Sequence, residues 1–423
     1  MSKANVRMKE GSTWDEGVDM PRFSPLTRSI SADVAIIGGG ITGITTAYLL
    51  SNTGLDVVLV EKDRLTRGAT GATTAFLTQY IDTELSELIS MFGVKKAQAI
   101  VASHAQAIDD IEGIIQTENI ECEFMRCSNY IYATSAQEKE RLAVEQQAAQ
   151  MLGLHTKAVR EGSFPFEYSG CVELPGQAKF HPLKYLAGLV DILQQRGVRI
   201  FEETEAHIDH EGSPTVVTAP DGEVVAQQVV VATYAPLGKK LFFKKAFYTS
   251  YIYEMTVPAG IISEGIYEDM HEPYHYFRVD QGGGRDRVII GGEDHRSDLP
   301  VKSSKSFQAL ARYIETTFPS IPYTLVRRWE GSIVESVDGL AFIGSLEHFN
   351  IFYATGFSGN GMTYSMIAAT SFMYLIQNQQ NELLFLYDPT RIPTIRSLAF
   401  KGRDYTNELV GGAVKNTMQG SKE

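Results

Sequence analysis

The chain has 423 residues, of which 43% are hydrophobic and 21% charged, so it can bury a large core and is not a disordered, collagen-like or disulfide-stapled chain. Its 38 basic and 51 acidic residues give a net charge of −13, which repels phosphate backbones and argues against nucleic acid as a partner. The length predicts two or three domains.

Cysteine use and hydropathy indicate a cytoplasmic protein. The three cysteines, Cys122, Cys127 and Cys171, lack the spacing of a metal site and suit a reducing compartment. The amino terminus lacks the apolar core of a signal peptide, and no run of about 18 apolar residues predicts a membrane span. We therefore expect no metal site and no membrane span.

The first 80 residues contain a sharp change of pattern. Residues 1–30 mix charge, proline and glycine without periodicity and predict an arm on the surface. Residues 32–37 form a β-branched apolar run, a glycine turn and a helix to about residue 51 follow, and residues 56–60 form a second apolar run. This order predicts a strand, helix and strand unit.

Further elements follow in chain order. Apolar spacing predicts two helices over 85–115, broken near Gly93. A capping box of Ser135 and Glu138 starts a helix over 136–152, and Pro182 starts another that ends before Gly197. A hairpin is expected at residues 221–222.

In the second half of the chain the residue pattern changes from one typical of β-strands to one typical of alternating strands and helices. Residues 248–292 are aromatic and β-rich and predict an antiparallel sheet. Residues 350–354 then predict a strand, 355–361 a glycine turn and 362–377 a helix. Because α/β segments bracket the β-rich one, we expect a nucleotide-binding domain that is interrupted by a second domain.

The glycine turn after the first strand has the spacing of a phosphate cradle. In Gly38, Gly40 and Gly43, the first glycine permits the turn, the second lets a pyrophosphate approach, and the third lets helix and strand pack. Glu61 ends the second strand, where a carboxylate can accept ribose hydroxyls. The pattern predicts a dinucleotide site; the alternative is a structural glycine turn.

A second glycine cluster distinguishes FAD from NAD. Gly356, Gly359 and Gly361 open a helix some 300 residues after the first turn, and a helix N-terminus there can face negative charge that develops on a flavin ring. The alternative is a connector that merely needs glycine.

Motifs along the chain resemble those of one family. They are DVAIIGGGITGITTAYLL, LVEKD, GATGATTAFLT, VVVAT, DGLAFIG and YATGFSGNGMT. Together they resemble the D-amino-acid-oxidase-like FAD-dependent oxidoreductases of the glycine and sarcosine oxidase type, over about residues 30–395. The likeness is strongest to the γ-glutamylputrescine-oxidase-like branch, whose members often carry a Rieske iron–sulfur domain.

The resemblance implies an α/β fold with a Rossmann-like FAD-binding domain, interrupted by an α+β substrate domain with a mostly antiparallel sheet. The expected boundaries are an arm over 1–30, the FAD-binding domain over 31–82, 170–240 and 326–390, the substrate domain over 83–169 and 241–325, and a tail over 391–423.

The resemblance also implies a set of cofactor-binding residues. The pyrophosphate would contact Gly38, Gly40, Ile41, Thr42 and Gly43, and the adenosine ribose would contact Glu61 and Lys62. The backbone of Ala206 would contact adenine, and Thr70, Gly71, Thr73 and Thr74 would line the flavin side. The pyrimidine edge of the flavin ring would contact Gly356, Gly359, Asn360, Gly361, Met362 and Thr363.

Three departures from the family pattern have consequences. No cysteine follows Cys171, so we expect neither a Rieske module nor flavin attached to a late cysteine, and FAD should be noncovalent. Where sarcosine-type members carry an oxygen-activating lysine, this chain has Val288, Ile289 and Ile290. Fast reaction with oxygen is not expected, and the electron acceptor is left open between oxygen and another molecule.

One strand of the β-rich segment contains the candidate substrate residues. Alternation puts Tyr274, Tyr276 and Arg278 on one face and His275 on the other. Tyr276 and Arg278 are candidates for positioning substrate, and the Arg278 fork suits a carboxylate; the alternative is a structural arginine. Residues 293–295 are interpreted as a strand end rather than a metal triad.

We therefore expect an enzyme that oxidises a C–N bond of an amine or amino acid by hydride transfer to flavin N5, with hydrolysis of the imine. Two alternatives stay open at this stage. One is an NAD-linked dehydrogenase, and the other is a flavin-binding subunit or regulatory protein without turnover of its own.

Overall fold

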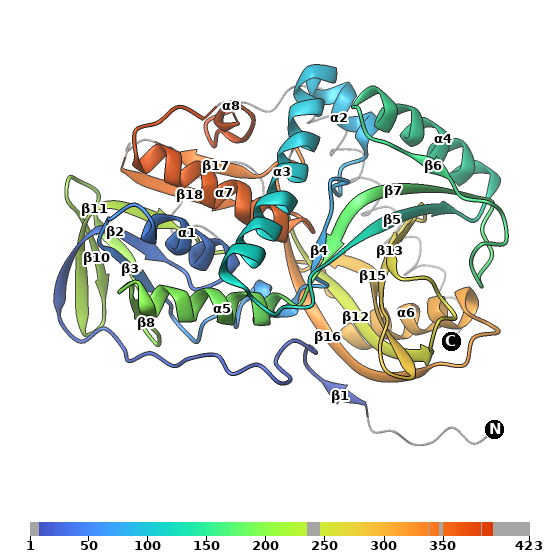
Figure 1. Cartoon of the computed structure of the whole chain (residues 1–423), viewed down its shortest axis with the longest axis horizontal. Helices are drawn as coiled ribbons and strands as arrows, with labels where there is room; N and C mark the ends of the chain where they lie inside the picture. Colours follow the sequence, from blue (N-terminus) through green and yellow to red (C-terminus); the bar gives the residue numbers. More distant parts are fainter. Residues whose placement is uncertain (1–7, 235–245, 337, 347–349, 382, 392–423) are drawn as a thin grey trace.

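The computed structural model describes residues 8–234, 246–336, 338–346, 350–381 and 383–391, which fold around two β-sheets lying side by side (Figure 1). Beyond Arg391, the tail expected over 391–423 lies outside the described residues, as do residues 1–7 of the arm. Among the helices of the described ranges, none is long and apolar enough to cross a membrane.

The eight-stranded sheet contains the predicted strand, helix and strand unit. Its main path runs β17 (Phe342–Ser345), β18 (Ile351–Thr355), β11 (Gly222–Val231), β2 (Ser29–Ile37), β3 (Val57–Val60) and β8 (Arg199–Phe201), with β10 (Thr215–Ala219) paired to β11 and β9 (His207–His210) paired to β10. From β18 to β8 every pairing is parallel. The Rossmann-like sheet expected from the sequence is confirmed.

Both faces of the parallel sheet are covered. Val34 and Ile36 of β2 enter the core that contains α1 (Ile41–Ser51), α5 (Pro182–Gln195) and α7 (Gly361–Ile376). Ala35 and Ile37 point to the other face, with Leu26 of the arm and the β9–β10 pair. Burial on both faces explains why these strands are continuous apolar runs rather than alternating ones.

The ten-stranded sheet is mostly antiparallel. Its path runs β1 (Lys9–Glu10), β16 (Thr324–Glu335), β12 (Ala246–Pro258), β15 (Arg285–Arg296), β14 (His275–Asp280), β13 (Gly265–Asp269), β5 (Met125–Ala133), β7 (Gly170–Lys179) and β4 (Phe76–Leu77), with β6 (Lys157–Ala158) paired to β7. The other helices are α2 (Leu85–Phe92), α3 (Val94–Glu118), α4 (Ala136–Met151), α6 (Ser303–Thr317), α8 (Leu384–Tyr387) and the 3₁₀ turn η1 (Ala69–Ala72).

The two faces of this sheet have different neighbours. Tyr253 and Phe277 pack with Phe307 of α6 on one face. The opposite face, here called the inner face, joins the core that includes α1 and α7 through Ile252 and Ile289. Side chains that project from the inner face therefore point toward the nucleotide-binding unit.

The local predictions are confirmed with small shifts. The break at Gly93 separates α2 from α3, and the capping box starts α4. Sequence analysis did not predict β5, α6, β16 or β17. Because β7 and β16 pair within the ten-stranded sheet, the boundaries expected at residues 170 and 326 are corrected: both strands belong with the second sheet.

The amino-terminal arm is more than a surface segment. It starts beside β16 and runs along both sheets to β2 (Figure 1). The backbone N–H groups of Phe23 and Leu26 donate to Glu202 and Thr204, each at 3.0 Å. Trp14, which lies between β1 and Phe23 in the sequence, is fully buried.

Candidate cofactor and substrate site

The first and third glycines of the turn are required by close approach. Gly38 has φ +115°, and a Cβ on it would lie 2.6 Å from the carbonyl oxygen of Ala232. A Cβ on Gly43 would lie 1.9 Å from the carbonyl oxygen of Gly38. Helix α1 therefore begins directly against the end of β2, as the motif predicts.

The start of α1 fits a pyrophosphate. Most of this helix is buried, and its N-cap residue, Gly40, has no side chain to cap the first-turn N–H groups. Within the described part of the chain, the side-chain acceptor at this turn is the Thr70 hydroxyl, 3.1 Å from the Ile41 nitrogen. A buried helix start with open N–H groups is a binding site for anionic phosphate.

Glu61 lies beside the glycine turn, at the end of β3. It directly follows β3, and its Oε2 accepts the N–H of Gly39 at 2.6 Å while Oε1 accepts the N–H of Asp63 at 2.9 Å. The carboxylate is therefore held rigidly beside the glycine turn, with further lone pairs for hydroxyl donors. Lys62 is exposed next to it.

The segment expected to contact adenine lies close to Glu61. Thr204 N–H donates to the Glu61 carbonyl at 2.8 Å, and Glu203 N–H donates to the Asp63 carbonyl at 2.9 Å. Ala206 is buried and directly precedes β9; the family resemblance implies a strand at this residue, and in the structure the strand begins one residue later.

The second glycine cluster contacts the loop after β4. Asp82 Oδ2 accepts the N–H of Gly359 at 2.6 Å, and Asn360 Oδ1 accepts the N–H of Asp82 at 3.0 Å. Gly361 and the buried Met362 then begin α7. Gly356 has φ +75°, so the turn between β18 and α7 uses its left-handed backbone.

Helix α7 is hydrogen-bonded near its N-terminus to α1 and to the middle of α3. The hydroxyls of Thr42 and Ser365 lie 2.8 Å apart. Thr363 Oγ1 lies 2.7 Å from Nδ1 of His104 on α3, and burial lowers the pKa of His104 to about 3. His104 is therefore neutral, and the structure brings the two glycine clusters, 300 residues apart in sequence, to one place.

Arg278 has a structural role, which corrects the expectation that it binds a substrate carboxylate. It is 1% exposed. Its Nε and Nη2 donate to Asp280 at 3.0 and 2.7 Å, and Nη1 lies 3.0 to 3.2 Å from the carbonyl oxygens of Thr74, Ala75 and Phe180. No free fork is left for a ligand.

Tyr276 does project from the inner face. Its ring meets Phe76 edge to face with centroids 5.7 Å apart, and its hydroxyl lies 2.8 Å from the Ser250 hydroxyl. Tyr274 remains 37% exposed. The alternation predicted for this strand is confirmed, because His275 points to the other side and binds Asp269.

Two inner-face carboxyl groups were missed by sequence analysis. Burial, followed by the charge of Asp82, raises the pKa of Glu268 to about 8; its Oε1 accepts from Asn129 at 2.9 Å. Burial also raises the pKa of Asp294 to about 7. The sequence does hold a sign of Glu268: it lies two residues after Ile266 in a short strand and so shares its face, where an apolar residue is expected.

Residues 293–295 do not form a metal triad. Glu293 reaches Nε2 of His275 at 3.4 Å, and the ring of His295 stacks on Tyr251. The three side chains therefore point to different neighbours, as expected for a strand end.

Comparison with known proteins identifies the family. The family model described as FAD dependent oxidoreductase (DAO) matches residues 33–375. The chain belongs to this family. The match spans the glycine turn, both sheets and most of α7, and family membership implies FAD rather than NAD as the cofactor.

Two relatives illustrate the range of the DAO family. A putative Rieske 2Fe-2S iron–sulfur protein, YhfW, of Bacillus subtilis (strain 168) is 30% identical over 413 residues, which cover 95% of this chain and 80% of the relative. The γ-glutamylputrescine oxidoreductase of Escherichia coli (strain K12) is 24% identical, with 82% of this chain and 84% of the relative covered.

Solved structures of DAO-like proteins share the fold. The glycine oxidase of Geobacillus kaustophilus superposes with a TM-score of 0.72 at 20% identity, over 86% of this chain and 99% of that one. The L-proline dehydrogenase of P. horikoshii gives 0.70 at 19% identity, over 87% and 98%.

Proposed function

We propose that the protein oxidises the C–N bond of a cationic amine at noncovalently bound FAD and that it lies near the γ-glutamylputrescine oxidoreductase branch. When bound, FAD supplies a two-electron acceptor for the hydride on the carbon beside nitrogen. The product imine would hydrolyse in water. The sites expected from the motifs, including Thr73, Thr74 and Gly71 on the flavin side, are part of this proposal.

The observation that carries the amine assignment is the chemistry of the inner face. Glu268 and Asp294 lie there beside tyrosines, whereas all the guanidinium nitrogens of Arg278 are hydrogen-bonded to Asp280 and three backbone carbonyl oxygens. Lys179, the neighbouring cation, is held by Glu264 at 2.7 Å and by Asp280 at 2.6 Å. Carboxyl groups and aromatic rings favour a cation, and neither Arg278 nor Lys179 is left free to bind a carboxylate ligand.

The proposed role of Glu268 is to bind a positively charged group of the substrate that is distant from the reacting nitrogen. A cation beside Glu268 favours its ionised form, so binding of the amine would release the proton that burial keeps on the carboxyl group. Tyr276 would line the same region and orient the substrate. Orientation of this kind contributes a large part of catalysis in bimolecular reactions.

Anaerobic titration of the purified yellow protein with amines and amino acids tests the proposal. Loss of the visible flavin band with amines is the expected result. A protein whose flavin no amine or amino acid reduces would instead be a flavin-binding subunit without turnover. Acid precipitation should leave the yellow colour in the supernatant, and a yellow pellet would contradict noncovalent FAD.

A further inference from the structure

Four consecutive carbonyl groups beside the proposed flavin site are each bound by a side-chain N–H. Trp329 Nε1 donates to the carbonyl oxygen of Ala72 at 2.9 Å, and Trp14 Nε1 donates to that of Thr73 at 2.6 Å. Arg278 Nη1 lies 3.2 and 3.1 Å from those of Thr74 and Ala75. The backbone of residues 72–75 is therefore held in place by these side-chain donors.

The donors come from three distant parts of the chain. Trp14 lies in the amino-terminal arm, Arg278 in β14 and Trp329 in β16. The chain contains two tryptophans in all, and both bind this one segment. Ala75 has φ +60°, a conformation that a non-glycine residue keeps only where its surroundings hold it.

Trp14 is held in one orientation. Its ring is fully buried, and the edge of the His181 ring meets it with centroids 5.0 Å apart. The guanidinium carbons of Arg278 and Arg287 lie 5.4 and 5.5 Å from the ring centre, within the range of a cation–π interaction. The indole N–H therefore stays directed at Thr73.

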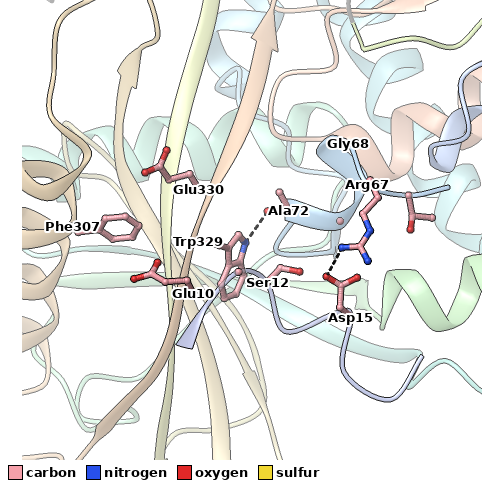
Figure 2. Close-up of a pocket in the computed structure, with 12 residues that line it drawn as sticks. Glu10, Ser12, Asp15, Arg67, Gly68, Ala72, Phe307, Trp329 and Glu330 are labelled. Atoms are coloured by element: carbon pink, nitrogen blue, oxygen red, sulfur yellow. Dashed lines mark hydrogen bonds and ion pairs between the residues drawn. The ribbon is translucent and has the colours of Figure 1, made fainter. Parts of the chain in front are cut away.

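The arm around Trp14 is anchored on both sides of the segment. Asp15 pairs with Arg67 at 3.3 Å, and Glu16 pairs with Arg327 of β16. A surface pocket of about 370 Å³ lies between the arm, η1 and β16. Figure 2 shows the Asp15–Arg67 pair and the Trp329–Ala72 bond among the residues that line it.

The residues that precede this segment, 66–71, contact the phosphate turn. Thr66 N–H donates to the Gly39 carbonyl at 2.9 Å, and the Thr70 hydroxyl accepts from Ile41 at 3.1 Å. A shift of residues 66–75 would therefore move both the flavin side and the pyrophosphate side of the proposed cofactor site.

We infer that Trp14 is a positioning residue for FAD: its indole N–H fixes the Thr73 peptide unit, and through it the flavin-side segment. The inference rests on the proposed cofactor site. It assigns a function to the arm, which lies outside the part of the chain matched by the family model.

Substitution Trp14→Phe tests the inference, because phenylalanine keeps an aromatic ring and loses the N–H. We expect FAD to bind about three- to tenfold more weakly, the typical effect of one lost hydrogen bond, and the visible circular dichroism of bound flavin to change. Quenching of the remaining Trp329 emission by FAD measures the affinity. Lys9→Met is the matched control, since it removes the exposed arm pair with Glu16 and no contact to the segment.

Two outcomes would overturn the inference. One is unchanged affinity and unchanged flavin dichroism in Trp14→Phe, which would make Trp14 a packing residue only. If that variant fails to fold, replacing both tryptophans by benzothienylalanine keeps the ring shape and removes both N–H groups; unchanged flavin dichroism there would be equally decisive. Failure of the native protein to bind FAD would refute the cofactor proposal itself.

Discussion

The carboxylate of Asp82 accepts the backbone N–H of Gly359 at 2.6 Å and thereby joins the loop after β4 to the turn before α7. A Cβ at position 359 would lie 2.9 Å from both carboxylate oxygens, so a larger residue there would require the Asp82 side chain to shift. Because the Asp82 charge also raises the pKa of Glu268 and of Asp294, it couples the end of α7 to the inner face electrostatically.

Substitution Asp82→Asn should move the pH dependence of amine binding to lower pH. Asparagine keeps an oxygen for the Gly359 N–H but removes the negative charge, so the pKa of Glu268 should fall from about 8 toward its ordinary value. A cation binds the ionised form of Glu268, and that form would then be present at lower pH. Titrating the flavin absorbance with a non-reducing amine from pH 6 to 9 measures the shift. Identical profiles in native and variant protein would separate Asp82 from the substrate region.

Substitution Glu61→Gln should weaken FAD binding about tenfold or more. The two carboxylate oxygens both accept backbone N–H groups, from Gly39 and Asp63, and the amide of glutamine would turn a donor toward one of them. Equilibrium titration of the apoprotein with FAD measures the loss. An unchanged dissociation constant would mean that Glu61 does not bind the ribose.

Two glycine-to-alanine substitutions should have opposite effects on thermal stability. Gly43→Ala puts a Cβ 1.9 Å from the Gly38 carbonyl oxygen, which helix α1 cannot accommodate without moving, so we expect little folded protein. Gly113 lies inside α3 with no atom within 4 Å of a Cβ, and alanine there should stabilise by about 0.5 to 1 kcal/mol. Thermal melts of both variants check the pair; a well-folded Gly43→Ala protein would contradict the helix–strand contact.

Reduced flavin should react slowly with oxygen. The strand position of the oxygen-activating lysine falls in β15, where Ile289 lies on the inner face and is fully buried, and the guanidinium nitrogens of Arg278 beside it are all bound by Asp280 or by backbone carbonyl oxygens. Among the described residues beside Ile289, no cationic donor is therefore left free to bind an anionic oxygen species. Stopped-flow mixing with oxygenated buffer, compared with a dye acceptor, measures the rates. Oxygen that reacts as fast as the dye, with stoichiometric peroxide, would identify an oxidase.

The parts of the fold that were predictable from sequence depend on local rules. The spacing of Gly38, Gly40 and Gly43 encodes a turn whose steric demands lie within a few residues, and the capping box of Ser135 fixes the start of α4 by contacts three residues apart. Such features need no knowledge of distant segments.

The unpredicted parts depend on contacts between distant segments. Trp14 gave no periodic signal, because its position is set by Thr73, 59 residues away. Arg278 was expected to be free to bind a substrate carboxylate. The residues of β14 give no indication of its partners, the carbonyl oxygens of Thr74, Ala75 and Phe180. Strand alternation gives the face of a side chain, whereas its partners depend on what packs against that face.

The central claim, a cationic amine substrate without an α-carboxylate, is tested most directly by a matched pair of reductants. 1,4-Diaminobutane and ornithine differ by one carboxylate, and anaerobic flavin reduction by each is followed in native protein and in Glu268→Gln, with the exposed Glu330→Gln as control. We expect at least tenfold faster reduction by the diamine at subsaturating concentration, and a loss of about tenfold for the diamine in Glu268→Gln only. Faster reduction by ornithine, or a Glu268→Gln protein as active toward the diamine as the native one, would contradict it.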